Sequence, residues 1–155
     1  MRLAAIYCVW HDWDMLRYSI ENIRPLVDEI IVIGSVVSNY GERSLIAPKY
    51  QGHPEFYHLD PNLTISPRDN ETYKRNYGLD MARNRGCTHF LTMDADEFYE
   101  PEPFLKQKAR FLNESNIAGL VCDCQTYFKS PKLTIGLDTT LVPFIHVLTP
   151  TIRHE

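Results

Sequence analysis

Apolar runs flank one amphipathic stretch in the first third of the chain, a pattern typical of a βαβ unit. Residues 3–9 form a continuous apolar run, which predicts a central parallel strand covered on both faces. A helix should follow, with Asp12 or Asp14 as its N-cap, and Pro25 should end or kink it. Residues 29–33 read as the second strand, reached by a right-handed crossover. The apolar stripe of the helix recurs at helical spacing and comprises Leu16, Ile20, Ile23 and Val27.

The middle of the chain predicts a third strand and a second helix. Residues 36–54 contain glycines and prolines and read as an irregular excursion, and residues 55–59 alternate weakly as a short strand. Ser66-Pro67 followed by an acid is a helix-start signature, and that helix should end near Gly86. One of its faces carries Tyr73, Tyr77 and Met81.

The last part of the chain continues the alternation of strands and helices. Residues 88–93 predict a fourth strand, and Pro101 or Pro103 opens a helix after it. Residues 117–128 and 141–148 predict later strands joined by a loop around residues 130–136. The pattern predicts an α/β fold, a mostly parallel central sheet flanked by helices, in a single domain over residues 1–155. The inward side chains of the last helix should be Phe104, Leu105, Ala109, Phe111 and Leu112.

Two aspartates directly follow the fourth strand. Asp94 and Asp96 are one residue apart, so both carboxylates can face one hard divalent cation. Open α/β sheets bind ligands beyond the carboxyl ends of their strands, which favours a metal site holding phosphate oxygens. The alternative is an ordinary solvated turn.

Composition excludes several classes of function. The chain has 155 residues, 44% of them hydrophobic, which is enough for a proper core, and its net charge of -4 makes nucleic acid an unexpected partner. Basic residues nevertheless precede acidic ones in sequence, so cationic side chains and a metal could share one diphosphate, unless these charges only coat helix surfaces. The basic residues are Arg68, Lys74, Arg75, Arg83 and Arg85, and the acidic ones are Asp94, Asp96, Glu97, Glu100 and Glu102.

The four cysteines predict a reducing compartment. They lack C-x-x-C spacing and no secretory signal precedes them, so we expect a cytoplasmic protein. Cys122 and Cys124 share one strand face and could bind a soft metal, but core packing is favoured. No apolar run approaches the roughly 20 residues of a transmembrane segment.

Residues 74–83, KRNYGLDMAR, followed by residues 90–98, FLTMDADEF, resemble the R-N-x-G-L-x-x-A and D-x-D pattern of family 2 glycosyltransferases. The likeness extends over about residues 3–105. It implies a Rossmann-like GT-A fold, in which residues 1–100 form the nucleotide-binding half and residues 101–155 a partial acceptor half. It also implies a nucleoside-diphosphate sugar donor, a glycan or similar acceptor, and Mn²⁺ or Mg²⁺ as cofactor.

The resemblance assigns roles by position. Asp96 would be the main metal ligand, Asp94 would contact the metal or the ribose, and Arg75 would contact the nucleotide. Val9 and Trp10 stand where the family lines its base pocket, and Trp10 is expected either to stack on the base or to join the core.

The sequence departs from the family in two places. Gly34-Ser35 stand where one or two aspartates usually bind the base or ribose, and Asp60 could serve instead. The catalytic base of an inverting transferase is missing as a motif, which leaves Asp123 and Asp138 as isolated candidates. The chain is also shorter than typical members, so we expect a minimal form, a truncated one, or one completed by forming a homo-oligomer.

Three hypotheses follow. The first is a metal-dependent, inverting glycosyltransferase acting from a nucleotide sugar on a hydroxyl acceptor. The second is a sugar-phosphate nucleotidyltransferase, although no glycine-rich phosphate loop follows the first strand. The third is a nucleotide-sugar-binding module without transferase activity. His146 and His154 could supply a third metal ligand, but we expect them to be surface residues.

Overall fold

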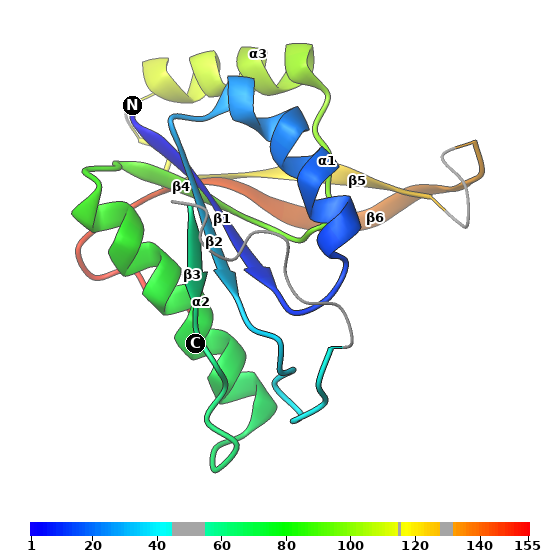
Figure 1. Ribbon diagram of the computed structural model, residues 1–155. Helices are drawn as coiled ribbons and strands as arrows, with labels where there is room; N and C mark the ends of the chain where they lie inside the picture. Colours follow the sequence, from blue (N-terminus) through cyan, green and yellow to red (C-terminus); the bar gives the residue numbers. More distant parts are fainter. Residues whose placement is uncertain (45–54, 115, 128–131) are drawn as a thin grey trace.

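The computed structural model describes residues 1–44, 55–114, 116–127 and 132–155, and within them the chain forms one six-stranded sheet with helices on both faces (Figure 1). The strand order is β3-β2-β1-β4-β6-β5. The α/β class and the flanking helices predicted from sequence are confirmed. The sheet is mixed: β1, β2, β3 and β4 run parallel, whereas β6 is antiparallel to β4 and β5 is antiparallel to β6.

Strands β1 (Leu3–Val9), β2 (Glu29–Gly34) and β4 (His89–Met93) form the buried centre of the sheet. Ala5 of β1 pairs with Ile30 on one side and Leu91 on the other, so both edges of β1 are satisfied. Continuous apolar sequence suits these strands because helices cover both of their faces. β3 (Phe56–His58) is short and adds the outer parallel strand.

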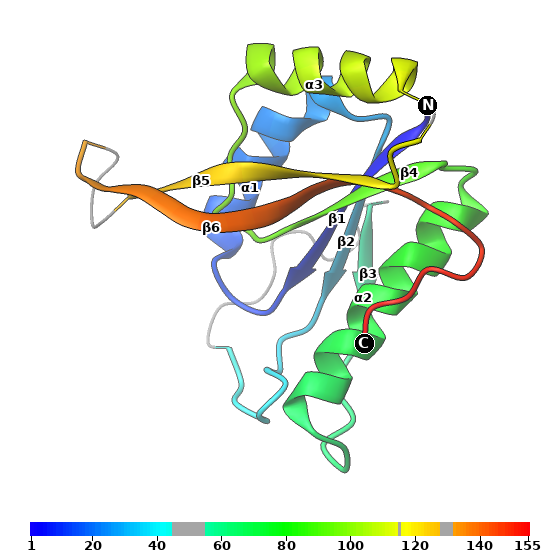
Figure 2. The ribbon, with the colours of Figure 1, turned by 180° about the vertical axis from the view of Figure 1, so that it is seen from behind.

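Helices α1 (Trp13–Ile23) and α3 (Pro101–Asn113) cover one face of the sheet, and α2 (Pro67–Asn84) covers the other. The two views of the ribbon show these layers (Figures 1 and 2). A short 3-10 helix, η1 (Arg24–Leu26), contains Pro25 and ends the first crossover, as the sequence predicts. Asp12 stands at the N-cap of α1, but its side chain makes no capping bond and its φ is 59°.

The second helix begins as predicted and packs closely on the sheet. The Ser66 hydroxyl accepts a hydrogen bond from the Asp69 amide, which caps the helix. Tyr73 is exposed, whereas Tyr77 and Met81 are half-buried and pack against the edge of the core. The buried positions are Asn70, Lys74, Gly78, Leu79 and Ala82. Gly78 allows the close approach, because a Cβ there would overlap Ile6 of β1.

The last two strands, β5 (Gly119–Tyr127) and β6 (Thr134–Val147), form a long antiparallel hairpin that projects from the body of the molecule (Figure 2). β6 begins well before the predicted start at residue 141. The expected loop at Ser130-Pro131 lies outside the described residues, as do residues 45–54 of the excursion.

The prediction for α3 was partly wrong. Phe104 and Phe111 are buried, but the other three side chains expected inside are exposed, because only a narrow stripe of α3 meets the core. The exposed residues are Leu105, Ala109 and Leu112.

Candidate functional site at the carboxyl edge of the sheet

The four parallel strands all end at one edge of the sheet, where the predicted site residues follow them. The α1 crossover leaves β1 on one face, and α2 arrives at β4 on the opposite face. Since β1 and β4 are neighbours in the sheet, the strand order reverses between them. Ligands of open α/β sheets bind at such a point.

Two acids and an arginine line a cavity of about 230 Å³ directly after β4. We call it the acidic cavity; it is lined by Arg75, Thr92, Met93, Asp94, Glu97, Val142 and Pro143. Asp94 and Glu97 are linked twice. The Glu97 amide donates to the Asp94 carbonyl at 3.2 Å, and the Asp94 amide donates to Glu97 Oε2 at 3.2 Å. Asp96 is exposed beside the cavity and is not among its lining residues.

The negative charges of this turn are incompletely balanced. Burial is the main cause that raises the pKa of Asp94, and the charge of Asp96 raises it further, while Arg75 opposes the shift. Burial also raises the pKa of Glu97, and the charges of Asp94 and Asp96 add to that rise. A bound cation would relieve this repulsion. The donor set consists of carboxylate oxygens, which fits a hard ion such as Mg²⁺ or Mn²⁺.

Across the described ranges, no group of three or more His, Cys, Asp or Glu side chains is arranged to hold a metal ion. A divalent ion at Asp94 and Asp96 would therefore take its remaining oxygen ligands from substrate phosphates and water, which is how Mg²⁺ is usually held.

Arg75 places a guanidinium at the cavity from α2. Its Nε donates to Glu71 Oε1 at 2.9 Å, and its NH2 lies 2.8 Å from the same oxygen. The NH2 group is 3.8 Å from Asp94 Oδ1, an ion pair that is longer than a hydrogen bond. Glu71 thus orients Arg75, and the Asp94 carboxylate is not held by a hydrogen bond from Arg75.

Helix α1 holds the acidic turn from the other face of the sheet. The buried Ser19 hydroxyl donates to the Glu97 carbonyl at 2.6 Å and is itself 2.9 Å from the Tyr7 hydroxyl. Asn22 Nδ2 donates to the Tyr99 carbonyl at 3.0 Å, and Asn22 Oδ1 accepts from the Tyr99 amide at 2.8 Å. These contacts could not be predicted from the sequence, because Ser19 and Asn22 resemble ordinary polar residues of a helix.

The ends of β1, β2 and β3 carry the predicted nucleoside contacts. Val9 is buried, and Trp10 is half-buried with its ring 4.7 Å from that of His11. The buried Trp10 Nε1 has no hydrogen-bond partner among the described residues, so a donor is available here. Asp60 accepts a 2.7 Å bond from the Ser35 hydroxyl. That bond is the main cause that lowers the pKa of Asp60, and His58 lowers it further.

Lys74 also lies at this edge, and the sequence left open whether it binds a diphosphate or coats a helix surface. Its side chain is buried at 5% exposure, and its Nζ donates to Asn39 Oδ1 at 2.9 Å. Burial lowers the pKa of Lys74, and the charge of Asp60 opposes that shift. The pair Lys74-Arg75 was the feature of the sequence that could have predicted this burial. Neighbouring residues of a helix point in different directions, so when one side chain of the pair is buried, the other lies on the flank of the helix.

The two candidate bases lie on the hairpin. Asp123 is exposed on β5 and pairs with Leu141, next to the cavity residues Val142 and Pro143. Asp138 pairs with Cys124 in β6, and its side chain lies outside the described part of the structure. Asp123 is not among the described residues that line the acidic cavity.

The two histidines are not surface residues, which corrects the expectation. His146 and His154 are both half-buried, and their rings lie 5.5 Å and 6.2 Å from the ring of Phe90. Burial lowers the pKa of both imidazoles. The two rings come close to Phe90 because β6 pairs with β4 and the residues after β6 run along α2 (Figure 2).

The chain is thus an α/β protein, and the residues at the carboxyl ends of its parallel strands form a candidate site for an anionic ligand. Neither a protein-family model nor a curated protein matches the chain. Among solved structures, the crystal structure of S. aureus TarS 1-349 is similar, with a TM-score of 0.48 and 17% sequence identity over 96% of this chain. The match covers 47% of that structure, so the chain spans about half of its length. Among the helices described, none combines the length and apolar character needed to cross a membrane.

Proposed function

We propose that this protein is a metal-dependent glycosyltransferase of the GT-A class that moves a sugar from a nucleoside-diphosphate sugar to a hydroxyl group of a glycan or similar acceptor. One observation carries the proposal: Arg75, Asp94 and Glu97 surround a single cavity where β4 ends, with Asp96 beside them. A guanidinium and a cluster of carboxylates at such an edge suit a diphosphate that is shared between a cation and an arginine.

Each residue has a distinct part in the proposed reaction. Asp94 and Asp96 would hold Mn²⁺ or Mg²⁺, which when bound supplies positive charge to the leaving diphosphate. Arg75 would donate to a phosphate oxygen while Glu71 fixes its orientation. Trp10 and Asp60 would contact the nucleoside, Trp10 through its ring and its free N–H group, and Asp60 through a carboxylate that Ser35 holds in place.

The acceptor hydroxyl must lose a proton as it attacks the sugar. In an inverting reaction of the family 2 type, a carboxylate takes that proton. Asp123 and Asp138 remain the proposed candidates, because the hairpin that carries them also contributes Val142 and Pro143 to the acidic cavity.

Calorimetric titration with UDP, GDP and their sugar conjugates, with and without Mn²⁺, tests the proposal. We expect at least one of these ligands to bind only when the metal is present. Asp96→Ala should abolish that binding and leave the free energy of unfolding within about 0.5 kcal/mol of the wild type, because Asp96 is exposed. Slow hydrolysis of the donor sugar then distinguishes a transferase from a binding module. Absence of metal-dependent binding by every nucleotide contradicts the proposal.

A further inference from the structure

A second cavity adjoins the acidic one on the α2 face of the sheet. It has a volume of about 360 Å³ and shares Arg75, Thr92 and Pro143 with the acidic cavity. We call it the basic cavity; its other lining residues are Leu79, Phe90, His146, Ile152, Arg153 and His154. The shared wall means that a molecule in the basic cavity lies next to one in the acidic cavity.

The ionisable residues that line the basic cavity are all basic. Its ionisable members are two arginines and two histidines, and none of its lining residues is an acid. Its remaining wall is largely apolar, with Leu79, Phe90 and Ile152 among the lining residues. This combination suits a ligand that joins a negatively charged group to a less polar body.

The donors of this cavity are only partly used within the protein. Arg153 donates through NH1 to Asp80 Oδ1 at 2.6 Å, and among the described residues its Nε and NH2 have no acceptor. Arg75 uses Nε and NH2 toward Glu71, which leaves its NH1. His154 Nε2 is buried and finds no hydrogen-bond partner in the described part of the chain. Buried polar atoms usually have a partner, so an unpaired one beside a cavity points to a ligand.

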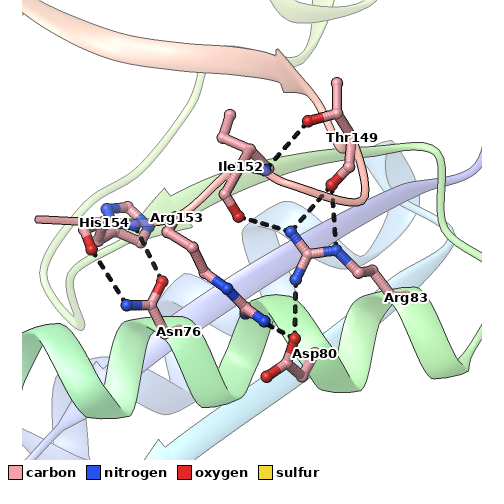
Figure 3. Close-up of polar contacts among 7 residues, drawn as sticks. All are labelled: Asn76, Asp80, Arg83, Thr149, Ile152, Arg153 and His154. Atoms are coloured by element: carbon pink, nitrogen blue, oxygen red, sulfur yellow. Dashed lines mark hydrogen bonds and ion pairs between the residues drawn. The ribbon is translucent and has the colours of Figure 1, made fainter.

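One wall of the cavity is held in place by α2 (Figure 3). We call residues 149–155 the strap. The side-chain amide of Asn76 forms two hydrogen bonds with the main chain of His154. Its Nδ2 donates to the His154 carbonyl at 3.1 Å, and its Oδ1 accepts from the His154 amide at 2.9 Å. These bonds fix the residue whose ring lies against Phe90.

Arg83 fixes the beginning of the strap. Its Nε and NH2 donate to the Thr149 carbonyl at 3.1 and 2.9 Å, and NH2 also donates to the Ile152 carbonyl at 2.6 Å. Asp80 accepts from both Arg83 and Arg153, so it ties the two guanidinium groups together. Asn76, Asp80 and Arg83 recur at helical spacing on α2, and this stripe presents Arg153 and His154 to the cavity in one arrangement (Figure 3).

We propose that the basic cavity binds an oxyanion group, a phosphate or a carboxylate, carried by the acceptor substrate. That the ligand is the acceptor substrate rests on the function proposed above, whereas the binding of an oxyanion in this cavity does not depend on that function. The free Nε and NH2 groups of Arg153 form the planar donor pair that such groups accept, and the apolar wall takes the part of the molecule next to the charge. The wall shared with the acidic cavity then places that molecule beside the donor sugar.

Binding of phenyl phosphate, benzoate and uncharged benzyl alcohol to the full chain tests this assignment. NMR spectra of the imidazole groups serve as the readout, because His146 and His154 line the cavity while His11, His58 and His89 do not. We expect phenyl phosphate, benzoate or both to shift the signals of His146 and His154, and benzyl alcohol to bind about tenfold more weakly than the anion that binds.

Arg153→Gln should weaken binding of the anion about tenfold, and Arg153→Lys should weaken it less because the charge remains. Arg110→Gln is the matched control, since Arg110 lies on α3 and forms an exposed ion pair with Glu114. Asn76→Ala should also weaken binding, because it releases His154. Equal affinity of Arg153→Gln and wild type, or shifts confined to the other histidines, overturns the proposal.

The same titration repeated in the presence of UDP and Mn²⁺ separates the two proposals. Unchanged binding of phenyl phosphate shows that the basic cavity is distinct from the donor site, and competition by UDP overturns the assignment. If UDP fails to bind but phenyl phosphate binds in the manner described, the oxyanion site stands and the proposed donor chemistry fails. Binding of glucose 6-phosphate supports a soluble acceptor, and binding to phosphatidic acid vesicles that Arg153→Gln abolishes supports a lipid-borne one.

Discussion

Arg75 and Asp94 lie side by side in the lining of the acidic cavity, with 3.8 Å between NH2 and Oδ1, while the shorter bonds of Arg75 go to Glu71. Asp94 therefore has a positive neighbour without being tied to it. The carboxylate remains free for a second cation, and the arginine remains free for an anion. This arrangement is the basis of the first two predictions.

Mn²⁺ affinity should rise with pH across the range in which the acidic turn loses its protons. Partial desolvation and the charges of the neighbouring acids hold the pKa of Asp94 and of Glu97 above the usual values, so both stay protonated to higher pH than an isolated carboxyl group in water. The protonated forms cannot bind metal, hence affinity increases as the pH rises through and above the usual titration range of Asp and Glu. Titration monitored by the EPR signal of free Mn²⁺ measures it. Asp94→Asn should weaken binding and reduce the pH dependence, and an affinity that is constant over this range contradicts the site.

Replacing Arg75 by lysine should weaken metal-dependent nucleotide binding by about tenfold, although the charge is kept. Lysine cannot donate to Glu71 and to a phosphate oxygen with the fixed geometry of the guanidinium. Isothermal titration with UDP and Mn²⁺ gives the affinity. Arg110→Lys is the matched control, because Arg110 also pairs with a glutamate four residues away but lies on α3. Equal affinities in the two variants would remove Arg75 from the site.

Ser19→Ala should lower the free energy of unfolding by about 1 to 3 kcal/mol. The change leaves the Glu97 carbonyl and the buried Tyr7 hydroxyl without the Ser19 hydroxyl that now contacts both. Urea denaturation measures the loss. Tyr18→Phe removes an exposed hydroxyl from the same helix and should change stability by less than about 0.5 kcal/mol. Mn²⁺ affinity should also fall in Ser19→Ala, because the acidic turn loses one of its anchors, and an unchanged affinity would show that the turn holds its shape alone.

Gly78→Ala should destabilise the protein by about 1 to 3 kcal/mol, even though alanine is the better helix former. The added Cβ would overlap Ile6, so α2 must move away from β1. Denaturant unfolding compares it with Asn84→Ala, an exposed change near the end of the same helix. Because α2 carries Arg75, nucleotide affinity should fall with stability in Gly78→Ala. Full stability in this variant would mean that the helix does not pack on the sheet as described.

The sequence predicted those parts of the fold that local pattern determines. The apolar runs of β1, β2 and β4 have no other stable place than the centre of a sheet, and Ser66-Pro67 specifies a helix start by its own chemistry. The predictions were wrong where the burial of a side chain depends on which other element packs against it. Leu112 is exposed because nothing in the described part of the chain packs on that side of α3, which periodicity cannot reveal.

The candidate site was partly predictable for the same reason. Position after a strand places Asp94 and Asp96 at the sheet edge, since strand direction alone determines it. The burial of Lys74, the anchoring of Glu97 by Ser19 and the grip of Asn76 on the strap depend on which elements meet across the sheet. These contacts join residues far apart in the sequence, and no local spacing encodes them.

Gly34 explains why no acid stands at the end of β2. A Cβ at this position would lie 2.5 Å from Phe56 Cε2 and 2.6 Å from Trp13 Cη2, so two aromatic rings already occupy the volume that any larger side chain would need. An aspartate introduced at residue 34 would have to displace one of them. The carboxylate nearest to this strand end therefore comes from the neighbouring strand: Asp60, which follows β3, is held there by a 2.7 Å hydrogen bond from the Ser35 hydroxyl.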